Sequence, residues 1–262
     1  MNSSANSETV LVTGASSGIG LKLVKCFAAD GCRLILVARN QDALEKLAEE
    51  LRSKNKIEAI VLPADLSLSE TPKRIFQELS TRKISVDVLV NNAGFGAIGA
   101  FAQLPLDRQI EMIQVNIAAL TELTGLFLPG MIERRRGGIL NVSSVAGFVP
   151  GPGMAIYYAT KAFVLSFTEA LATELEGMGV KVTALCPGPT PTNFGNVAGS
   201  EKVRLIRVPG TSAEKVARDG HAAFRHGRTI SIPGLQNKFV IYLARLMPRK
   251  FIRKIVRKFN GF

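Results

Sequence analysis

The chain has 262 residues, 47% of them hydrophobic, and carries a formal net charge of +12. This length allows a sizeable core and predicts one domain of the α/β type. Eight basic residues and no acidic residue fall within 238–262, so this stretch accounts for most of the excess charge. The rest of the chain is nearly balanced and has no nucleic-acid recognition motif, so nucleic acid is not expected as a partner.

Cysteine and histidine usage argues against a metal site. The chain has two histidines, and its three cysteines lack the spacing of metal ligands. We expect reduced cysteines that serve as packing residues, and a cytoplasmic location. Residues 1–8 lack the charged and apolar regions of a signal peptide, and no run of eighteen apolar residues follows, so 1–8 are predicted to form a flexible tail.

Short β-branched runs alternate with amphipathic segments along the chain. The runs predict seven strands, at 9–12, 34–37, 57–62, 86–90, 138–142, 180–185 and 228–232. The segments between them predict helices at 21–29, 41–54, 69–82, 106–136 and 154–178. Strand–helix alternation predicts a single Rossmann-type, doubly wound parallel sheet of about seven strands, with helices on both faces. In such a sheet ligands bind at the carboxyl ends of the strands.

A glycine-rich turn, Thr13-Gly14-Ala15-Ser16-Ser17-Gly18-Ile19-Gly20, joins the first predicted strand to the first helix. Gly14 allows a tight turn, Gly18 lets the backbone approach a pyrophosphate, and Gly20 permits close helix packing. The helix N-terminus offers unpaired N–H groups to an anion. The turn therefore indicates a dinucleotide site, the alternative being a strand–helix turn without a ligand.

Tyr157 and Lys161 lie four residues apart on a predicted helix, so their side chains share one face. A tyrosine that acts as a base at neutral pH needs its pKa lowered by roughly 3 units from about 10, or about 4 kcal/mol. A lysine cation ~4 Å away supplies about this much at an effective dielectric of ~20. We predict Tyr157 as the acid/base group, with Tyr158 as the competing tyrosine and an ordinary surface helix as the alternative.

These motifs occur in order with Asn91-Asn92-Ala93-Gly94 and Pro187-Gly188. Together they resemble the short-chain dehydrogenase/reductase family, from about Thr9 to Phe194. The resemblance implies hydride transfer between a nicotinamide and a carbonyl or alcohol, without a metal. It also implies that Ser144 hydrogen-bonds the substrate oxygen and that Asn116 holds a water in a proton relay. The alternative for Asn116 is a buried amide satisfied by backbone, and Ser143 is predicted to be structural.

The end of the second predicted strand, Val37-Ala38-Arg39-Asn40, has no acidic residue for an adenosine 2′-hydroxyl. Arg39 suits a 2′-phosphate, so NADP(H) is the predicted cofactor. The family resemblance adds Asp65 and Asn92 on the adenine side and Thr190 beside the nicotinamide. The predicted catalytic residues are Asn116, Ser144, Tyr157 and Lys161. The predicted cofactor contacts are Gly14, Ser16, Ser17, Gly18, Ile19, Gly20, Arg39, Asp65, Leu66, Asn92, Ala93, Gly94, Tyr157, Lys161, Pro187, Gly188 and Thr190.

Apolar residues around these motifs predict a pocket for a lipophilic carbonyl compound. They are Phe95, Ile98, Phe148, Val149, Met154 and Phe194. The predicted organisation is a catalytic domain at 9–233, with a substrate lid at 187–226, and a basic amphipathic extension at 234–262. Residues 248–262 interleave apolar and basic side chains, which is typical of a helix on an anionic membrane and also of one packed on the body or a neighbouring subunit.

Three functions remain open at this point. The first is an NADP(H)-dependent oxidoreductase, for which the family resemblance implies a homo-oligomer paired through its two long helices. The second is a non-catalytic NADP(H)-binding module recruited to a membrane or protein partner by its basic tail. The third uses the same residues for another reaction through transient oxidation, such as an epimerisation. The intact set of four catalytic residues favours an enzyme over the binding module.

Overall fold

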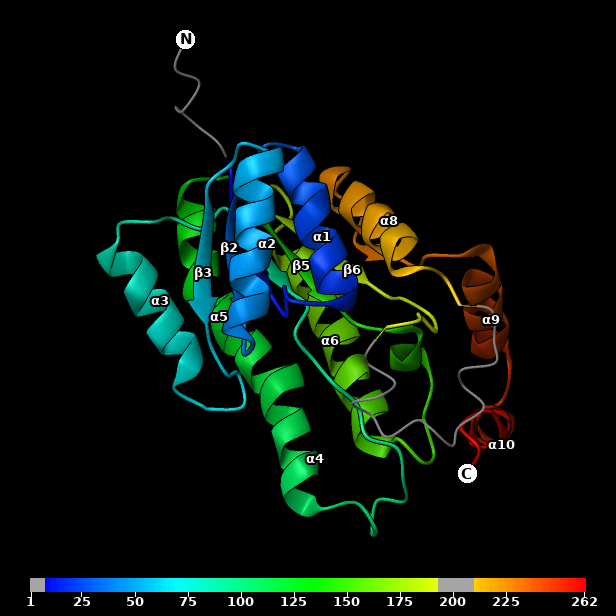
Figure 1. The fold of residues 1–262 in the computed structure, drawn as a ribbon. Helices are drawn as coiled ribbons and strands as arrows, with labels where there is room; N and C mark the ends of the chain where they lie inside the picture. Colours follow the sequence, from blue (N-terminus) through cyan, green and yellow to red (C-terminus); the bar gives the residue numbers. More distant parts are fainter. Residues whose placement is uncertain (1–7, 193–209) are drawn as a thin grey trace.

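Seven parallel strands form the central sheet, in the order β3-β2-β1-β4-β5-β6-β7 (Figure 1). The computed structural model describes residues 8–192 and 210–262. The strands are β1 (Thr9–Thr13), β2 (Arg33–Ala38), β3 (Ala59–Pro63), β4 (Val88–Asn91), β5 (Gly138–Val142), β6 (Lys181–Leu185) and β7 (Ile230–Ser231). The winding direction reverses between β1 and β4, so a crevice opens beyond the carboxyl ends of these two strands. The predicted doubly wound sheet is confirmed.

The strands are apolar on both faces because helices cover both sides of the sheet. Leu11 of β1 lies opposite Ile35 of β2 and Leu89 of β4, and all three side chains belong to one core cluster. Val10 and Val12 point to the other face and belong to a second cluster. Period-2 alternation thus divides the core into two layers.

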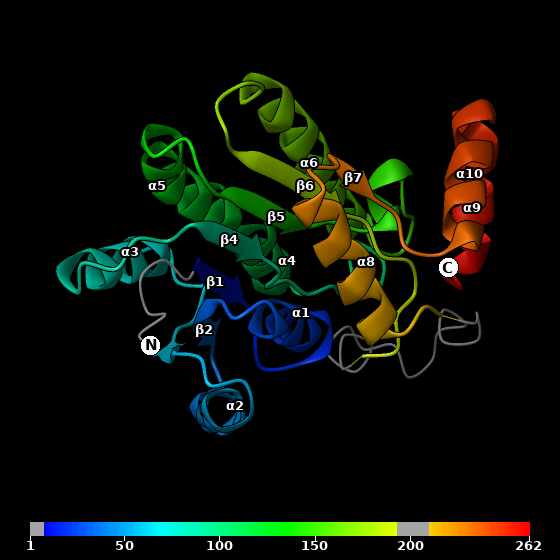
Figure 2. The same ribbon diagram turned by 90° about the horizontal axis from the view of Figure 1, so that it is seen from above.

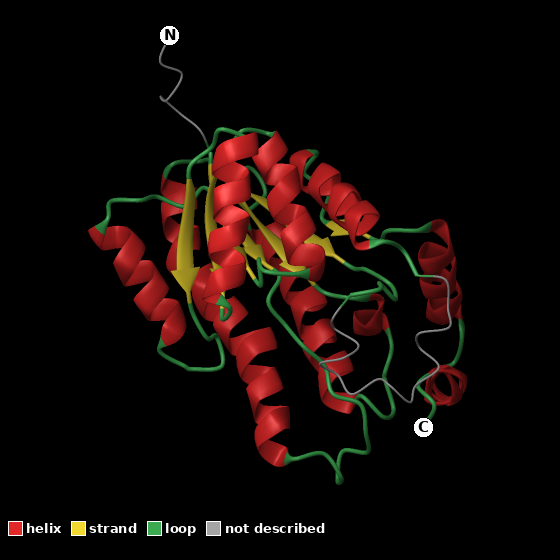
Figure 3. Ribbon diagram, viewed as in Figure 1, coloured by secondary structure: helices red, strands yellow, loops and turns green. Residues whose placement is uncertain are grey.

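Each face has its own set of helices, as Figures 2 and 3 show. One face carries α1 (Gly18–Ala29), α2 (Gln41–Lys54) and α8 (Ala213–Arg225). The other carries α3 (Thr71–Thr81), α5 (Ala119–Glu133) and α6 (Ala155–Glu174). The start of α2 follows from its sequence, because Asn40 caps it by accepting a hydrogen bond from the Ala43 N–H. Three further helices lie toward the end of the molecule at which the strands have their carboxyl ends. They are α4 (Leu106–Ile113), α9 (Leu235–Leu246) and α10 (Arg249–Phe259).

The helix predicted at 106–136 is continuous from Leu106 to Glu133, but it contains a π-helical turn at Gln114–Ala118 between α4 and α5. A π turn inserts an extra residue into the helix, and here it accompanies the burial of Asn116. By length and composition this helix could cross a membrane. In the fold, Leu123, Phe127 and Met131 of α5 are buried in the same cluster as the strands.

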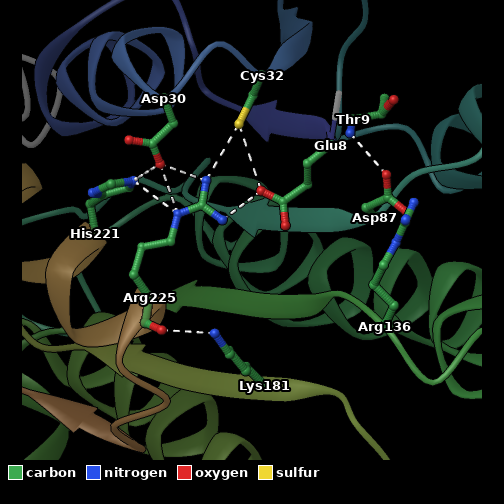
Figure 4. A network of polar contacts seen from close by, with 9 residues as sticks. All are labelled: Glu8, Thr9, Asp30, Cys32, Asp87, Arg136, Lys181, His221 and Arg225. Atoms are coloured by element: carbon green, nitrogen blue, oxygen red, sulfur yellow. Dashed lines mark hydrogen bonds and ion pairs between the residues drawn. The ribbon is translucent and has the colours of Figure 1, made fainter. Parts of the chain in front are cut away.

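An ionic network fixes α8 at the amino end of the sheet (Figure 4). The guanidinium of Arg225 pairs with Glu8, which precedes β1, and with Asp30, which follows α1. His221 also contacts the Asp30 carboxylate, at 2.9 Å. The backbone carbonyl of Arg225 accepts a hydrogen bond from Lys181 of β6. The network therefore joins α8 to three neighbouring elements.

The structure corrects part of the predicted lid at 187–226. Val216, Ala217 and Phe224 of α8 are buried in the core cluster that contains α1, so 213–225 form a layer of the body. The apolar side chains of α8 recur at helical spacing and pack on the core. A lid has no core surface to pack on. A lid remains a prediction for 187–212, of which 193–209, including Phe194, lie outside the described residues.

Candidate active site

A cavity of about 1500 Å³ lies at the carboxyl ends of the strands. Residues that follow β1 to β6 line it, as the position of the crevice requires. Two predicted site residues, Gly20 and Asn116, do not line it. The other predicted site residues do; they are Gly14, Ser16, Ser17, Gly18, Ile19, Arg39, Asp65, Leu66, Asn92, Ala93, Gly94, Ser144, Tyr157, Lys161, Pro187, Gly188 and Thr190.

The glycine turn has the backbone that its sequence predicts. Gly14 and Gly18 have φ values of 65° and 55°, in the left-handed region that favours glycine. A side chain at Gly20 would clash with the Gly14 carbonyl and the Asn92 amide, so Gly20 acts through packing. Ser17 precedes α1 without a side-chain capping bond, which leaves the first-turn N–H groups open to an anion. The turn thus fits a dinucleotide pyrophosphate.

Asn92 holds this turn against the end of β4. Its Nδ2 donates to the carbonyl oxygens of Thr13 and Gly14, at 2.9 and 3.2 Å. Its backbone N–H donates to Thr13 Oγ1, which also accepts from the Ala93 N–H. Asn92 lines the cavity, and its side-chain amide already bonds to the protein. The structure therefore shows that Asn92 positions the glycine turn. Its contact with the adenine side of the cofactor remains a prediction.

Arg39 and Asp65 form the far end of the cavity, beyond β2 and β3. Arg39 is exposed and lines the cavity, as expected for a group that meets a phosphate. Asp65 accepts hydrogen bonds from the backbone and hydroxyl of Ser67, at 3.0 and 2.8 Å. Burial raises the pKa of Asp65, but these hydrogen bonds and the nearby charge of Arg39 outweigh it, and the net pKa is lowered. The Arg39 guanidinium and the ionised Asp65 carboxylate therefore lie side by side at this end of the cavity.

Tyr157, Ser144 and Lys161 meet at the other end of the cavity. Ser144 follows β5; its Oγ accepts from the Ala146 N–H and donates to the Pro187 carbonyl at 3.3 Å. Tyr157 lies in the first turn of α6, beside the Ser144 side chain, which acts to lower the pKa of the Tyr157 hydroxyl. Lys161, one turn later, has its Nζ 5.9 Å from the centroid of the Tyr157 ring. Helical spacing thus brings Tyr157 and Lys161 together, and the end of β5 places Ser144 beside them.

The electrostatics differ from the sequence-based expectation. Burial raises the pKa of Tyr157 to about 12, although the hydrogen bond with Ser144 acts in the opposite direction. Burial also lowers the pKa of Lys161 to about 8. Its Nζ donates to the Val142 carbonyl at 2.8 Å, which directs the ammonium toward β5. The predicted lowering of the tyrosine pKa by Lys161 was therefore wrong for the protein alone, because burial dominates.

Asn116 lies behind the cavity wall and is 1% exposed. Its Oδ1 accepts from the Phe95 N–H at 3.1 Å, and its Nδ2 donates to the Phe95 carbonyl and to Thr160 Oγ1, both at 3.0 Å. A side chain at Gly94 would collide with this amide and touch Lys161. The structure thus shows a buried amide with protein partners, close to Lys161, and its relay role remains a prediction.

Hydrogen bonds distinguish the competing residues. Ser143 Oγ donates to the Lys161 carbonyl at 2.7 Å, which is a structural contact between β5 and α6. The Tyr158 hydroxyl donates to Asn260 Oδ1 at 3.1 Å. Thr190, at the end of the cavity beyond β6, donates to the Gly188 carbonyl at 3.0 Å. The geometry therefore supports Ser144 and Tyr157, rather than their neighbours, as the pair that faces a substrate.

The substrate end of the cavity is apolar, with one wall that the sequence analysis missed. Phe95, Ile98, Val149 and Met154 line it as predicted. Phe148 does not; it packs on a separate cluster with Leu165, Ala184 and Cys186. The missed lining residues come from α9 and α10: Val240, Ile241, Ala244, Ile255, Val256 and Phe259. The helical spacing of these residues predicts an apolar face on each helix. The sequence does not show which surface this face packs against.

Comparison with known proteins identifies the family. The family model for short chain dehydrogenases matches residues 8–202. A very-long-chain 3-oxoacyl-CoA reductase of Rattus norvegicus is 31% identical over 265 residues, covering 97% of this chain and 80% of its own. A short chain dehydrogenase of Pseudocercospora fijiensis is 38% identical over 190 residues, 72% of this chain and 61% of its own length.

Solved structures agree with these matches. A short-chain dehydrogenase from Sphingobium yanoikuyae in complex with NADPH has a TM-score of 0.82 and 34% identity, and the match covers 91% of this chain and 94% of the other. A family member from Burkholderia phymatum in complex with NAD has a TM-score of 0.80 and 25% identity, over 92% and 94%. The chain belongs to the short-chain dehydrogenase/reductase family of oxidoreductases.

Proposed function

We propose that this protein is an NADP(H)-dependent oxidoreductase that transfers a hydride between the nicotinamide and a carbonyl or alcohol. One observation carries the proposal: Ser144 and Tyr157, with Lys161 behind them, share one cavity with the glycine turn and Arg39. The cavity thus has a phosphate-binding end and a proton-transfer end.

The residues of the chain have distinct roles in this reaction. Ser144 and Tyr157 donate hydrogen bonds to the carbonyl oxygen, and the Tyr157 hydroxyl delivers its proton to that oxygen. The cofactor, when bound, supplies the hydride. Lys161 holds the ribose next to the nicotinamide. Asn116, through a water, links Lys161 to solvent. Burial of Tyr157 keeps its hydroxyl protonated at neutral pH, which suits the direction of carbonyl reduction.

Arg39 supports NADP(H) over NAD(H). It is the charged side chain at the end of β2, and no acidic residue within 37–40 is available for a ribose hydroxyl. The relative from Sphingobium yanoikuyae binds NADPH, whereas the one from Burkholderia phymatum binds NAD. The family thus uses both cofactors, and the choice in this chain rests on Arg39.

The apolar lining of the cavity supports a lipophilic substrate. The name of the rat relative, a very-long-chain 3-oxoacyl-CoA reductase, is consistent with this class. We also propose a cytoplasmic homo-oligomer. Exposed apolar side chains on the long helices, Leu106 and Ile110 of α4 and Phe163 of α6, support pairing through these helices.

A panel of ketones and aldehydes with NADPH and with NADH tests the proposal. We expect reduction of bulky apolar ketones to alcohols, with NADPH preferred. If the protein binds NADPH but turns over no carbonyl compound, the non-catalytic module is the correct alternative. If products are epimers formed without net oxidation of NADPH, the transient-oxidation alternative is correct.

A further inference from the structure

α9 and α10 lie together along one outer side of the molecule. Figure 1 views α10 along its axis with α9 in the plane of the page, and Figure 2 shows the reverse, so the two helices cross on the same side. Ile241 of α9 and Ile252 of α10 are buried against the body. Most of the remaining apolar side chains of both helices face away from it.

The outward side of α9 is a continuous apolar stripe. Its members recur at i, i+4, i+7 and i+11, a spacing that places them on one helix face. They are Leu235, Phe239, Tyr242 and Leu246, with exposed fractions of 83%, 66%, 64% and 67%. Ile241 lies on the opposite face of the helix, so Phe239, Tyr242 and Leu246 are directed away from the body. Leu235, at the start of the stripe, borders the cavity.

α10 continues this surface with four stripes at i, i+4 spacing, two of them basic. The first, Ile252, Val256 and Asn260, contacts the body. The second lies next to it and is exposed; its residues are Phe251, Ile255 and Phe259. The rest of the helix circumference is basic, with Arg249, Lys250, Arg253, Lys254, Arg257 and Lys258. An exposed apolar stripe thus lies between a packing stripe and a basic face.

We name the stripe of α9 and the exposed and basic stripes of α10 the α9–α10 face. Residues 238–262 contain eight basic residues and no acidic residue, so the face has no carboxylate of its own to neutralise it. Pairing two copies through this face would bring like charges together. An anionic lipid surface provides the opposite charge and an apolar phase for the exposed aromatic and aliphatic side chains.

We propose that the α9–α10 face docks the protein on an anionic membrane surface. The cavity continues to this face, because Leu235, Ile255 and Phe259 belong to the face, line the cavity and remain exposed. A lipophilic substrate dissolved in the bilayer therefore reaches Tyr157 directly from the docked face. This second step rests on the proposed function, whereas docking itself does not.

Co-sedimentation of the full chain with lipid vesicles tests the docking. One vesicle is phosphatidylcholine alone, and the other also contains phosphatidylglycerol. We expect binding to the anionic vesicle that weakens as salt is raised, with each basic residue near the surface worth about fivefold in affinity. The double variant Phe239→Ser, Leu246→Ser lowers this binding at least tenfold, and so does Arg253→Glu, Lys254→Glu.

Matched controls remove the same kinds of side chain elsewhere. Leu68→Ser with Met178→Ser removes two exposed apolar side chains, and Lys46→Glu with Arg74→Glu reverses two exposed charges. We expect both to bind vesicles like the wild type. Equal binding to neutral vesicles, or unchanged binding of Phe239→Ser, Leu246→Ser, overturns the proposal.

Light scattering without vesicles tests the competing occupant. If the wild type is an oligomer that Phe239→Ser, Leu246→Ser dissociates, a second copy covers the face and the proposal is wrong. The substrate route has its own measurement, in which a water-soluble ketone and a ketone dissolved in the vesicles are compared. We expect Phe239→Ser, Leu246→Ser to lose turnover of the ketone dissolved in the vesicles and to keep turnover of the water-soluble ketone. Loss of both would contradict the route without affecting the docking result.

Discussion

The hydroxyl of Tyr158 donates a hydrogen bond to Asn260, which lies 102 residues further along the chain. Asn260 Nδ2 in turn donates to the Pro152 carbonyl at 2.8 Å, and the Asn260 side chain is 1% exposed. The Tyr158 ring meets the Tyr157 ring edge to face, with centroids 6.1 Å apart. These contacts fix the last helix of the chain beside the proposed catalytic tyrosine.

Asn260→Ala is expected to loosen α10. The substitution leaves the buried Tyr158 hydroxyl and the Pro152 carbonyl without this partner, which lowers the free energy of unfolding by about 1–3 kcal/mol. It also raises KM for an apolar ketone more than it lowers kcat, because α10 supplies part of the cavity wall. Urea unfolding and steady-state kinetics measure the two effects. The exposed Asn55→Ala is the control, with a change within about 0.5 kcal/mol; equal effects of the two variants would exclude the role of Asn260.

Arg39→Ala is expected to reduce the preference for NADP(H). The loss of a charge-assisted hydrogen bond to a 2′-phosphate, worth about 1.5–3 kcal/mol, raises KM for NADPH by roughly 10- to 100-fold. KM for NADH changes little, since NADH has no such phosphate. Initial rates with both cofactors measure this, and the exposed Arg74→Ala is the control. Unchanged KM for NADPH in the Arg39 variant would contradict the assignment.

Lys161 is expected to make stability pH-dependent. Burial lowers its pKa to about 8 in the fold, against about 10.4 in an unfolded chain. A depressed lysine pKa gives a contribution to stability that is fully present above the unfolded pKa and is lost as the pH falls through the folded one. Relative to Lys161→Met, the wild type should therefore gain on the order of 3 kcal/mol in free energy of unfolding from about pH 7 to about pH 10.

Urea unfolding of both proteins across this range measures the difference. The exposed Lys46→Met serves as the control, whose difference from the wild type should stay constant with pH. A constant difference for Lys161→Met as well would show that Lys161 keeps an ordinary pKa in the fold.

Local patterns predicted most of this site. The glycine turn and the Tyr157–Lys161 spacing each depend on a few neighbouring residues, and the parallel sheet fixes where they meet. The roles of α10 and Asn260 could not be predicted, because their partner residues lie about a hundred positions away. The π turn at Gln114–Ala118 has no local sequence signal, and the raised pKa of Tyr157 depends on burial, which only the fold determines.

The most direct test of the account compares Tyr157→Phe with Tyr158→Phe in NADPH-dependent ketone reduction. Both substitutions remove one hydroxyl from adjacent positions that line the cavity, but the Tyr158 hydroxyl is bonded to Asn260, whereas Tyr157 is the proposed proton donor beside Ser144. We predict that Tyr157→Phe lowers kcat by about 10²- to 10⁴-fold while NADPH still binds, and that Tyr158→Phe keeps kcat within a few-fold of the wild type. Wild-type turnover by Tyr157→Phe would contradict the assignment of Tyr157 as the proton donor.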